Sequence, residues 1–306
     1  MPPKKICVVV SAPLTIKAFM LNHLVAMNSK YHLAVVANAD DFDFLKRLGV
    51  DADTFSIGIE RRISPWNDFV ALVSLVRLFR AQRFDLVHSV TPKAGLLAMS
   101  AGFLARVPVR VHIFTGQVWV TRVGWRRLFL KILDRLLAAC ATHILVDSAS
   151  QRNFLLGEGI VSDKKSRVLA NGSICGVDTR RFAPNPTARG SIRDAAKIPQ
   201  QDTIFLYLGR LNQDKGVLDL GKAFSLLCRE NKHIHLMIVG PDEDGMQEQI
   251  SRVCHACSDQ LHFIGYTDVP EQYMAAADVF CLPSYREGFG SSIIEAASVG
   301  IPAIGS

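Results

Sequence analysis

Short apolar runs rich in β-branched residues alternate with segments of helical periodicity along the whole chain, and this alternation limits the fold more than any other feature. In the first part of the sequence the apolar runs lie at 5–11, 33–38, 86–90, 109–114, 144–147 and 166–170. The segments between them have helical spacing at 16–28, 66–82, 93–105, 124–140 and 150–158. Apolar strands with little polar alternation, separated by helices, indicate an α/β fold whose parallel sheet is covered on both faces.

The pattern stops once and then restarts. Residues 181–200 contain three prolines and a glycine but no long apolar run, so this stretch is the expected linker. After it, strands are expected at 204–208, 235–239, 261–264 and 279–282, and helices at 217–229, 246–257, 271–276 and 292–299. A chain of 306 residues is long enough for two domains. We therefore expect two Rossmann-like parallel-sheet domains that face a cleft, at 1–182 and 183–306. The second is expected to be incomplete at its C-terminus, because another strand starts at 301–304 with no helix to cover it.

Charge is distributed unevenly between these two expected domains. The chain has 35 Lys and Arg against 28 Asp and Glu, a net charge of +7. Residues 1–182 hold 25 basic and 13 acidic side chains, or +12, whereas the remainder holds 10 basic and 15 acidic ones, or −5. This split suggests that the first domain meets an anionic partner or surface. The split excludes a protein that is basic along its whole length and coats nucleic acid, and we expect no nucleic-acid partner.

Cysteine usage and hydropathy point to the cytoplasm. Seven cysteines without regular spacing argue against a disulfide framework and for a reducing compartment. Cys254-His255-Ala256-Cys257 resembles half of a zinc site, but no second pair stands at metal spacing, so cysteines that pack inward from a helix are the simpler interpretation. No uncharged stretch reaches the ~20 apolar residues needed to span a bilayer.

Two familiar phosphate-binding signatures are missing. The sequence has no G-x-x-x-x-G-K-[ST] and no G-x-G-x-x-G after a strand, which disfavours P-loop kinases and ordinary dinucleotide dehydrogenases. In their place the segment YREGFGSSIIEA, at 285–296, follows the apolar strand 279–282 and opens a helix. Its two glycines allow close backbone approach to a ligand, and the unpaired N–H groups of a first helical turn favour an anion.

This segment has a second interpretation. Glu287 and Glu295 could both accept hydrogen bonds from ligand hydroxyls. Alternatively, Ser291 or Ser292 caps the helix and Glu295 only favours its positive end. The capping alternative accounts for the serines but not for two glycines around an aromatic residue.

A second cluster, GRLNQDKG at 209–216, directly follows the strand 204–208. An arginine and a lysine on one βα loop can clamp a diphosphate, Arg210 with a planar fork and Lys215 as a point charge. Basic residues in such loops are usually only solvated, so the cluster becomes specific when it is paired with the glycine-rich helix start.

Together, GRLNQDKG and EGFGSSIIEA resemble the donor-binding signature of retaining glycosyltransferases of family 4, which have the GT-B fold. NGSICGVDTRRF at 171–182 is similar to that family's Asn-Gly-Val-Asp turn, expanded here by residues 173–176. IVGPDEDG and FIGYTDVPEQYMAAADVFCLPSYREGFG extend the similarity through the second domain. In the first domain, HSVTPKAGLL and HIFTGQVW are closest to bacterial enzymes that build surface polysaccharides.

The resemblance implies a role for each matching side chain. Arg210 and Lys215, beside Gly209, would hold the donor's diphosphate and stabilise the leaving nucleotide. Glu287 would contact hydroxyls of the donor sugar, and Glu295 would accept from the ribose hydroxyls. The sugar–phosphate bond would be cleaved with retention and with neither a metal nor another cofactor, because the two cations stabilise the charge that develops on the diphosphate.

It also implies roles for the main chain. Backbone amides of Gly288, Phe289 and Gly290 would lie near the sugar and phosphate of the donor. The main chain around Ile264 and Gly265 would meet the base.

The first domain departs from the family pattern at two places. Where many members have two glycines after the first strand, residues 11–15 read SAPLT. Where many place a histidine before a glycine after a middle strand, this chain has Thr115-Gly116, with His112 three residues earlier in the strand. His112 and Thr115 are therefore candidates for the catalytic residue on the acceptor side, and a core position for His112 is the alternative.

The segment 122–140, RVGWRRLFLKILDRLLAAC, forms an amphipathic helix with five basic residues. One interpretation is a helix that packs on the core and has a solvated charged face. The other is docking on an anionic membrane surface, where each basic residue contributes about 1 kcal/mol. Asp134 within the helix argues against deep insertion. Both interpretations stay open.

These observations lead to one expected function and two alternatives. We expect a retaining glycosyltransferase that moves a sugar from a nucleotide sugar, UDP-linked in the first instance, to a lipid-linked or glycan acceptor in lipopolysaccharide, O-antigen or capsule assembly. It would work in the cytoplasm, with peripheral docking on the inner face of the plasma membrane if 122–140 binds lipid. The alternatives are a nucleotide-sugar epimerase and a catalytically inactive protein that binds sugar nucleotides.

Overall fold

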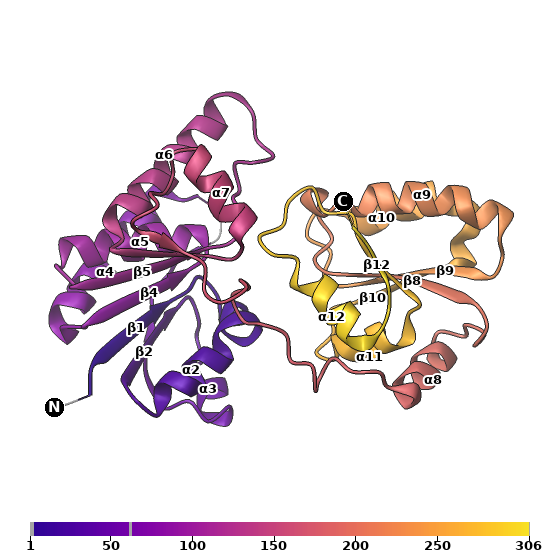
Figure 1. Ribbon diagram of the computed structural model, residues 1–306, viewed down its shortest axis with the longest axis horizontal. Helices are drawn as coiled ribbons and strands as arrows, with labels where there is room; N and C mark the ends of the chain where they lie inside the picture. Colours follow the sequence, from indigo (N-terminus) through magenta and orange to yellow (C-terminus); the bar gives the residue numbers. More distant parts are fainter. Residues whose placement is uncertain (1–2, 61–62, 306) are drawn as a thin grey trace. The chain divides into compact units, whose positions relative to one another are not determined.

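The computed structural model describes residues 3–60 and 63–305, which form two compact α/β units, Met1–Gly176 and Val177–Ser306 (Figure 1). The sequence placed residues 177–182 in the first domain. In the structure Phe182 packs into the core of the second unit, so these residues belong there. Both units have parallel sheets with helices on both faces, which confirms the expected fold class.

In the described residues the first unit has a seven-stranded sheet with the strand order β3-β2-β1-β4-β5-β6-β7, all parallel. Its strands are β1 (Lys5–Val9), β2 (His32–Ala37), β3 (Ala52–Ser56), β4 (Leu86–Val90), β5 (Val109–Phe114), β6 (His143–Val146) and β7 (Ser166–Arg167). Its helices are α1 (Pro13–Thr15), a π-helical turn (Ile16–Met20), α2 (Leu21–Asn28), α3 (Asp43–Arg47), α4 (Pro65–Gln82), α5 (Pro92–Leu104), α6 (Gly124–Cys140) and α7 (Ala149–Gly157).

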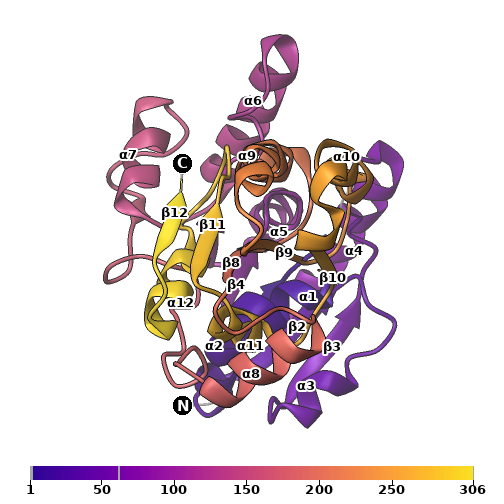
Figure 2. The ribbon, with the colours of Figure 1, turned by 90° about the vertical axis from the view of Figure 1, so that its right-hand side faces the viewer.

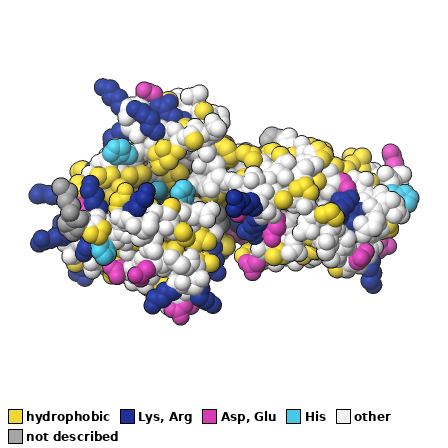
Figure 3. All heavy atoms as spheres, turned by 60° about the horizontal axis from the view of Figure 1, so that its bottom comes forward, with side chains coloured by type: hydrophobic (Ala, Val, Ile, Leu, Met, Phe, Trp, Pro, Cys, Tyr) yellow, Lys and Arg dark blue, Asp and Glu magenta, His cyan; other side chains and the backbone are white. Residues whose placement is uncertain are grey.

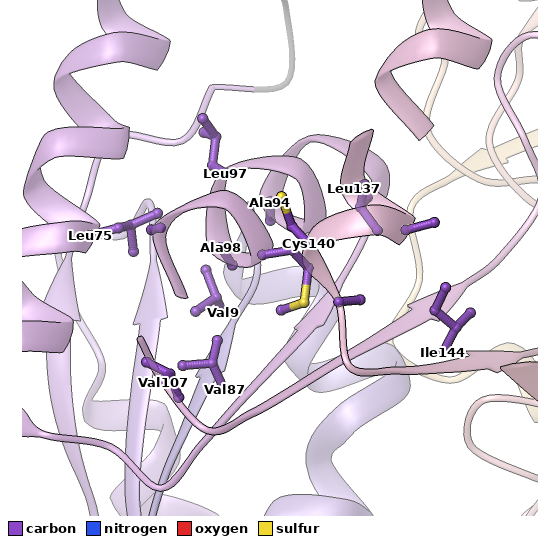
Figure 4. Packing of buried hydrophobic residues seen from close by; sticks show 14 of the residues in the cluster. Val9, Leu75, Val87, Ala94, Leu97, Ala98, Val107, Leu137, Cys140 and Ile144 are labelled. Carbon is purple, nitrogen blue, oxygen red and sulfur yellow. The ribbon is translucent and has the colours of Figure 1, made fainter. Parts of the chain in front are cut away.

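The core of this unit lies on both faces of the sheet. On one face α4, α5 and α6 cover Val9 and Val87, and Figure 4 shows Ala94 and Ala98 of α5 directed at these strand residues. On the other face α2, α3 and the π-helical turn cover a second apolar cluster. Gly95 of α5 lets the helix come close to the sheet, because a Cβ there would lie 2.3 Å from the His112 ring.

In the described residues the second unit has a five-stranded parallel sheet with the order β10-β9-β8-β11-β12. Its strands are β8 (Thr203–Leu208), β9 (Ile234–Val239), β10 (Leu261–Gly265), β11 (Val279–Leu282) and β12 (Ala303–Gly305). Figure 2 shows α9 (Val217–Glu230) and α10 (Met246–Val253) on one face of this sheet. The opposite face carries α8 (Pro186–Ala195), α11 (Pro270–Ala276) and α12 (Ser291–Val299). Two short 3-10 turns, Gln213–Lys215 and His255–Gln260, complete the unit.

The expected linker at 181–200 is wrong, because half of it is the helix α8. Asn185 caps this helix by accepting from the N–H of Ala188 at 3.0 Å, and Pro186 stands at its first position. Arg193 is fully buried and donates to carbonyl oxygens of Ala276 and Asp202 and to the carboxylate of Asp278. A buried, fully paired arginine ties α8 to the sheet, and sequence periodicity could not show this.

Two cysteines also differ from expectation. Cys228 of α9 and Cys257 of the second 3-10 turn are joined in a disulfide, so they are not independent buried thiols. Cys254 is free, and its thiol donates to the carbonyl of Gly221 at 3.2 Å. The pattern Cys254-His255-Ala256-Cys257 is therefore explained by packing and cross-linking within the second unit.

The strand orders locate the edge where a ligand can bind in each unit. In open parallel sheets ligands bind beyond the carboxyl ends of the strands, where the strand order reverses and neighbouring loops diverge. That point lies between β8 and β11 in the second unit and between β1 and β4 in the first. The two motifs singled out from the sequence follow β8 and β11, so both stand at the reversal point of the second unit.

Candidate functional site

Glycines bring three loops of the second unit together at the carboxyl edge of its sheet. Gly216 has φ +64°, and a Cβ there would lie 1.9 Å from the carbonyl oxygen of Pro283, directly after β11. Gly240 has φ +141°, and a Cβ there would lie 1.9 Å from the carbonyl oxygen of Gly209, directly after β8. Only glycine permits these approaches. The loops after β8, β9 and β11 therefore form one surface.

Arg210 and Asn212 in the loop after β8 are held by an acidic residue of the loop after β9. The guanidinium of Arg210 donates to the carboxylate of Glu243 at 2.9 Å, and the amide of Asn212 donates to the same oxygen at 3.3 Å. The main-chain N–H of Glu243 donates to the carbonyl of Leu211 at 3.1 Å, and the N–H of Leu211 donates to the carbonyl of Pro241 at 2.9 Å, so the two loops are fixed to each other. The Oδ1 of Asn212 is buried and accepts no hydrogen bond from the described residues, so it remains available to a ligand donor.

Lys215 and Glu287 form the ion pair that joins the two motifs. The Nζ of Lys215 lies 2.5 Å from Oε1 of Glu287, and both side chains are partly exposed. The main-chain N–H of Tyr285 donates to the carbonyl of Asp214 at 3.0 Å, which holds the loops after β8 and β11 together beside this pair. The structure thus unites a lysine and a carboxylate that stand 72 positions apart in the sequence.

A buried tyrosine of β8 fixes the main chain of the loop that follows this strand. Tyr207 on β8 is fully buried, and its hydroxyl donates to the carbonyl of Arg210 at 2.8 Å. Burial is the main reason that the pKa of Tyr207 is raised well above its usual range, and the Glu287 carboxylate contributes. The phenol therefore stays a donor and fixes the main chain that carries Arg210.

The helix α12 begins at the glycine-rich segment. Its N-cap is Gly290, with φ +75°, and it makes no side-chain capping bond, so the alternative in which Ser291 or Ser292 occupies the cap is wrong. Gly288 and Phe289 come directly before this cap. The amides of the first turn therefore start at the same edge as Lys215 and Glu287, where they favour a negatively charged group.

Glu295 lies in the second turn of α12 and is partly buried. Burial raises its pKa, and Arg181 opposes this effect. Arg181 is itself paired with Glu271 at 2.9 Å. A partly buried carboxylate of this kind gains from hydroxyl donors that replace water.

Ile264 and Gly265 end β10 at the same edge. Gly265 has φ +74°, and its carbonyl accepts from the N–H of Gly240 at 2.7 Å. The end of β10 is thereby joined to the loop after β9, which in turn contacts Gly209. Gly209, Ile264 and Gly265 therefore stand on the same edge of the sheet as Lys215 and Glu287.

The two candidate residues of the first unit, His112 and Thr115, lie in different surroundings. His112 is 1% exposed, its Nδ1 lies 2.8 Å from the hydroxyl of Ser89, and burial lowers its pKa to about 3. It is a neutral core residue, which is the alternative that the sequence left open. Thr115 follows β5 at the carboxyl edge, and its carbonyl accepts hydrogen bonds from Gln117 and Gln151.

Helix α6 packs on the core of the first unit through Leu137, Ala138 and Cys140, and two of its basic side chains are paired within the same unit. Arg127 and Lys131 both pair with Glu158 at the end of α7. Asp134 is 9% exposed and accepts from the indole N–H of Trp119 at 2.7 Å. Because Asp134 is turned inward, it does not argue against contact of the outer face with lipid.

The outer face of α6 carries large exposed hydrophobic side chains: Trp125, Leu128, Phe129, Ile132 and Leu136. The expected apolar face on the core is present at Leu137, Ala138 and Cys140, but α6 also carries this second, outward row of apolar side chains. Figure 3 shows a face of the first unit on which Lys and Arg side chains lie among hydrophobic ones. Within the part of the chain that the structure describes, no helix is long and apolar enough to cross a membrane.

Sequence reasoning missed several groups of the site. Asn212 and Asp214 lie inside the recognised motif without having been selected, and Glu243 and Tyr207 lie outside it. Asn212 and Asp214 could have been chosen because polar residues crowd that loop. Nothing in the sequence showed that Glu243 would meet Arg210, since this depends on the pairing of β8 with β9.

Comparison with known families and proteins gives matches in both units. Residues 21–172 match the family model described as "Glycosyl transferase 4-like domain", and residues 188–306 match "Glycosyl transferases group 1". The capsular polysaccharide biosynthesis glycosyltransferase CapM of Staphylococcus aureus is 25% identical over 250 residues, which are 81% of this chain and 65% of CapM. An Escherichia coli UDP-Gal:alpha-D-GlcNAc-diphosphoundecaprenol alpha-1,3-galactosyltransferase is 28% identical over 80% of this chain and 63% of its own length. The chain thus spans a little under two thirds of each relative.

Solved structures resemble the chain in fold. Anabaena Alr3699/HepE in complex with UDP and glucose superposes with a TM-score of 0.78 at 18% identity, over 99% of this chain and 80% of HepE. WaaG, a glycosyltransferase involved in lipopolysaccharide biosynthesis, gives a TM-score of 0.69 at 15% identity, over 98% of this chain and 80% of WaaG. These likenesses show the two-unit GT-B architecture.

Proposed function

We propose that this chain, whose two units carry a glycosyl transferase 4-like domain and a glycosyl transferases group 1 domain, moves a sugar from a nucleotide sugar to a lipid-linked or glycan acceptor. The observation that carries the proposal is the ion pair of Lys215 with Glu287 at the reversal point of the second sheet. In this pair the ammonium group of Lys215 can bind a phosphate, and the adjacent carboxylate of Glu287 can accept hydrogen bonds from sugar hydroxyls.

The donor's diphosphate would lie against Arg210 and Lys215. In the structure each cation has a carboxylate partner, Glu243 for Arg210 and Glu287 for Lys215. A bound diphosphate would replace the two carboxylates as the partner of Arg210 and Lys215. Glu287 would then accept hydrogen bonds from hydroxyls of the donor sugar. Glu295 would accept from the ribose, and the main chain at Ile264 and Gly265 would meet the base.

The chemistry follows from this arrangement. The bond between the anomeric carbon and the diphosphate oxygen breaks, and Arg210, Lys215 and the first-turn amides of α12 stabilise the charge that develops on the leaving diphosphate. The acceptor oxygen forms the new bond on the face that the diphosphate leaves, so the configuration is retained, and its proton passes to the diphosphate. No metal is needed in this account because the two cations supply the positive charge.

UDP is the proposed nucleotide, and a diphospholipid-linked saccharide is the proposed acceptor. Two considerations support this choice: HepE, which has the same fold, binds UDP and UDP-glucose, and the E. coli relative is named for a UDP-galactose donor and a diphosphoundecaprenol-linked acceptor. The names of the relatives favour a place in capsule, O-antigen or lipopolysaccharide assembly.

The outer face of α6 would hold the first unit on the membrane. Trp125 and Phe129 are exposed on this face, and Arg126 lies over the Trp125 ring at 5.7 Å. Aromatic residues beside a basic group suit the interface of an anionic bilayer. A lipid-linked acceptor would then reach an enzyme that is already at its surface.

The test is a set of UDP-sugars incubated with the purified chain, with UDP release and the stereochemistry of the sugar as the two readouts. We expect UDP release that rises when diphosphoundecaprenol-linked GlcNAc is added. Binding of UDP without any release would favour the inactive sugar-nucleotide-binding protein. Inversion at a sugar carbon without an acceptor would favour the epimerase.

A further inference from the structure

A chain of three hydrogen-bonded side chains crosses the amino ends of three adjacent strands in the second unit. Asp202 directly precedes β8, His235 is the second residue of β9, and His262 is the second residue of β10. Nε2 of His235 lies 3.2 Å from Oδ2 of Asp202, and Nδ1 of His235 lies 3.1 Å from Nε2 of His262. This edge of the sheet is opposite to the one that carries the candidate site, so the chain plays no part in the proposed function.

The carboxyl end of the chain is shielded from water. Asp202 is 5% exposed and His235 is 7% exposed, whereas His262 is only partly buried. The second oxygen of Asp202 lies 3.0 Å from Nδ1 of the exposed His233. Burial raises the pKa of Asp202, but the hydrogen bonds from His233 and His235 outweigh it, so the pKa is lowered. Asp202 is therefore an ionised acceptor.

This carboxylate determines which ring nitrogens carry hydrogen. A carboxylate only accepts, so Nε2 of His235 donates to Asp202 and Nδ1 of the neutral ring is left as an acceptor. Nε2 of His262 then donates to that nitrogen. One added proton can be held on the outer nitrogen of His262 without breaking a bond. A second proton would put hydrogens on both nitrogens of the 3.1 Å contact, which then has no acceptor.

Other charged groups near this face of the sheet have partners of their own. Met237 and Ile264 follow the two histidines on the same strand face and pack in the core that α8 and α11 cover. The ionic and polar partners of these helices are Arg189 and Arg193 with Asp278, Glu271 with Arg181, and Asp194 with Gln200. Arg193 also donates to the carbonyl of Asp202 at 2.8 Å.

The second 3-10 turn, which leads into β10, brings no charge into the chain. Its His255 and Asp259 are exposed, and its Gln260 donates to the carbonyl of Ile234 at 2.7 Å. Among the residues that the structure describes, no group of three His, Cys, Asp or Glu side chains could hold a metal ion. We therefore consider a proton as the ligand of this chain.

We propose that Asp202, His235 and His262 form a pH-sensitive contact that holds the edge strand β10 to β9 and releases it in mild acid. While the contact lasts, the two rings hold at most one added proton, and after opening each ring takes its own. Because the open form binds more protons, acid favours it. Burial, and then the charge of His235, lower the pKa of His262, which has the same sign. Release of β10 would also weaken the 2.7 Å bond from Gly240 to the carbonyl of Gly265.

The test is hydrogen–deuterium exchange of the whole 1–306 chain, measured by mass spectrometry at about pH 8 and about pH 5.5. Each rate is divided by the intrinsic exchange rate at that pH, which gives the protection of residues 261–265. A histidine in water has a pKa of about 6.5, so one extra proton favours the open form about tenfold at pH 5.5. We expect β10 of the wild type to lose about this factor of protection.

His262→Gln separates this effect from a general loss of stability in acid. The glutamine amide can donate to Nδ1 of His235, and its carbonyl can accept when that nitrogen is protonated. The contact then survives at both pH values, and we expect no acid-induced loss of β10 protection. His255→Gln replaces an exposed histidine of the same unit and should keep the tenfold loss of the wild type.

NMR titration of the ring signals gives a second measurement that needs no substitution. We expect the His235 and His262 pair to take up one proton while β10 is protected. The inference is overturned if β10 of the wild type is equally protected at both pH values, or if His262→Gln loses protection as the wild type does. It is also overturned if both rings become protonated while β10 stays protected. None of these outcomes depends on UDP binding, so they do not affect the test of the proposed function.

Discussion

Nζ of Lys215 lies 2.5 Å from Oε1 of Glu287, at the edge where the neighbouring strands β8 and β11 end. Lys215 is the last residue of the 3-10 turn that follows β8, and Glu287 lies in the loop that follows β11. Each motif alone is an ordinary loop. Joined in this way, they place a cation, a carboxylate and the start of α12 at one edge of the sheet, and the predictions for the second unit follow from that arrangement.

Glu287→Gln should separate sugar recognition from nucleotide binding. The substitution replaces one carboxylate oxygen of the proposed acceptor by an amide NH2 and removes its charge, so the hydrogen bonds to sugar hydroxyls weaken and Lys215 loses its carboxylate partner. We expect UDP affinity to be equal or higher and UDP-sugar turnover to fall at least about tenfold. Glu248→Gln on α10, whose side chain is 73% exposed, is the control for both measurements. Equal loss of UDP and UDP-sugar binding would contradict the assigned role.

Glu243→Gln should tighten UDP binding. Arg210 must break its 2.9 Å contact with the Glu243 carboxylate before it can bind a diphosphate. A neutral glutamine at position 243 would compete less strongly with the diphosphate for the guanidinium. The pair is partly exposed and therefore weak, which limits the gain to about two- to fivefold. Calorimetric titration with UDP measures this gain, and weaker binding would show that Glu243 instead orients Arg210 for the ligand.

Gly216→Ala should disrupt the loop that carries Lys215. A Cβ would clash with the carbonyl of Pro283, and an L-residue at φ +64° is strained by about 1–2 kcal/mol on its own. We expect a clear loss of unfolding free energy in urea and weaker UDP binding. Gly190→Ala in α8, where a Cβ would meet nothing within 4 Å, should instead be neutral or stabilising.

The outer face of α6 should control membrane binding. Replacing Trp125 and Phe129 by alanine should reduce co-sedimentation with phosphatidylglycerol vesicles without lowering the melting temperature, because both side chains are exposed. Leu226→Ala and Leu227→Ala on α9 remove exposed side chains of similar character in the other unit and serve as controls. Unchanged co-sedimentation of the α6 variant would contradict the proposal. Arg127 and Lys131 are poor positions for this test, since their replacement would break the contacts with Glu158.

The pH dependence of stability should reveal the buried carboxyl of Asp147. Its pKa in the folded state is about 7, above the value near 4 of an exposed aspartate, so the folded state holds the proton more tightly. Stability is therefore highest when the group is protonated and falls as pH rises from about 4 through about 7. Asp147→Asn should be increasingly more stable than the wild type over this window. A constant difference between the two unfolding curves would contradict the assigned burial.

The regular elements could be predicted because hydrophobic periodicity determines them. The strands β4, β5 and β11 and the helix α6 have the bounds expected from the sequence. The edge strand β3 was missed because its burial is poor and its residues are polar, and α3 was missed because it has only five residues. The helix α8 was taken for a linker because it is held by polar contacts of Arg193, which leave no apolar pattern.

The site was predictable only as far as local motifs extend. Arg210, Lys215 and Glu287 stand in recognisable segments, and the strand order brings them to one edge. Glu243 could not be foreseen because its contact depends on the pairing of two loops. The outward apolar residues of α6 could be foreseen only as one of two interpretations, since a helical pattern gives an apolar stripe but not the side on which the partner lies.

The most direct measurement is calorimetric titration of the wild-type chain and of an Arg210→Ala, Lys215→Ala variant with UDP. Loss of two charge-assisted contacts should weaken UDP binding by about a hundredfold or more. Lys222→Ala and Lys232→Ala are the control variants, and the melting temperature of every variant is measured to show that it is folded. The account predicts that the wild type binds one UDP and that the double variant does not bind detectably. A wild type without UDP binding, or a double variant with undiminished affinity, would contradict it.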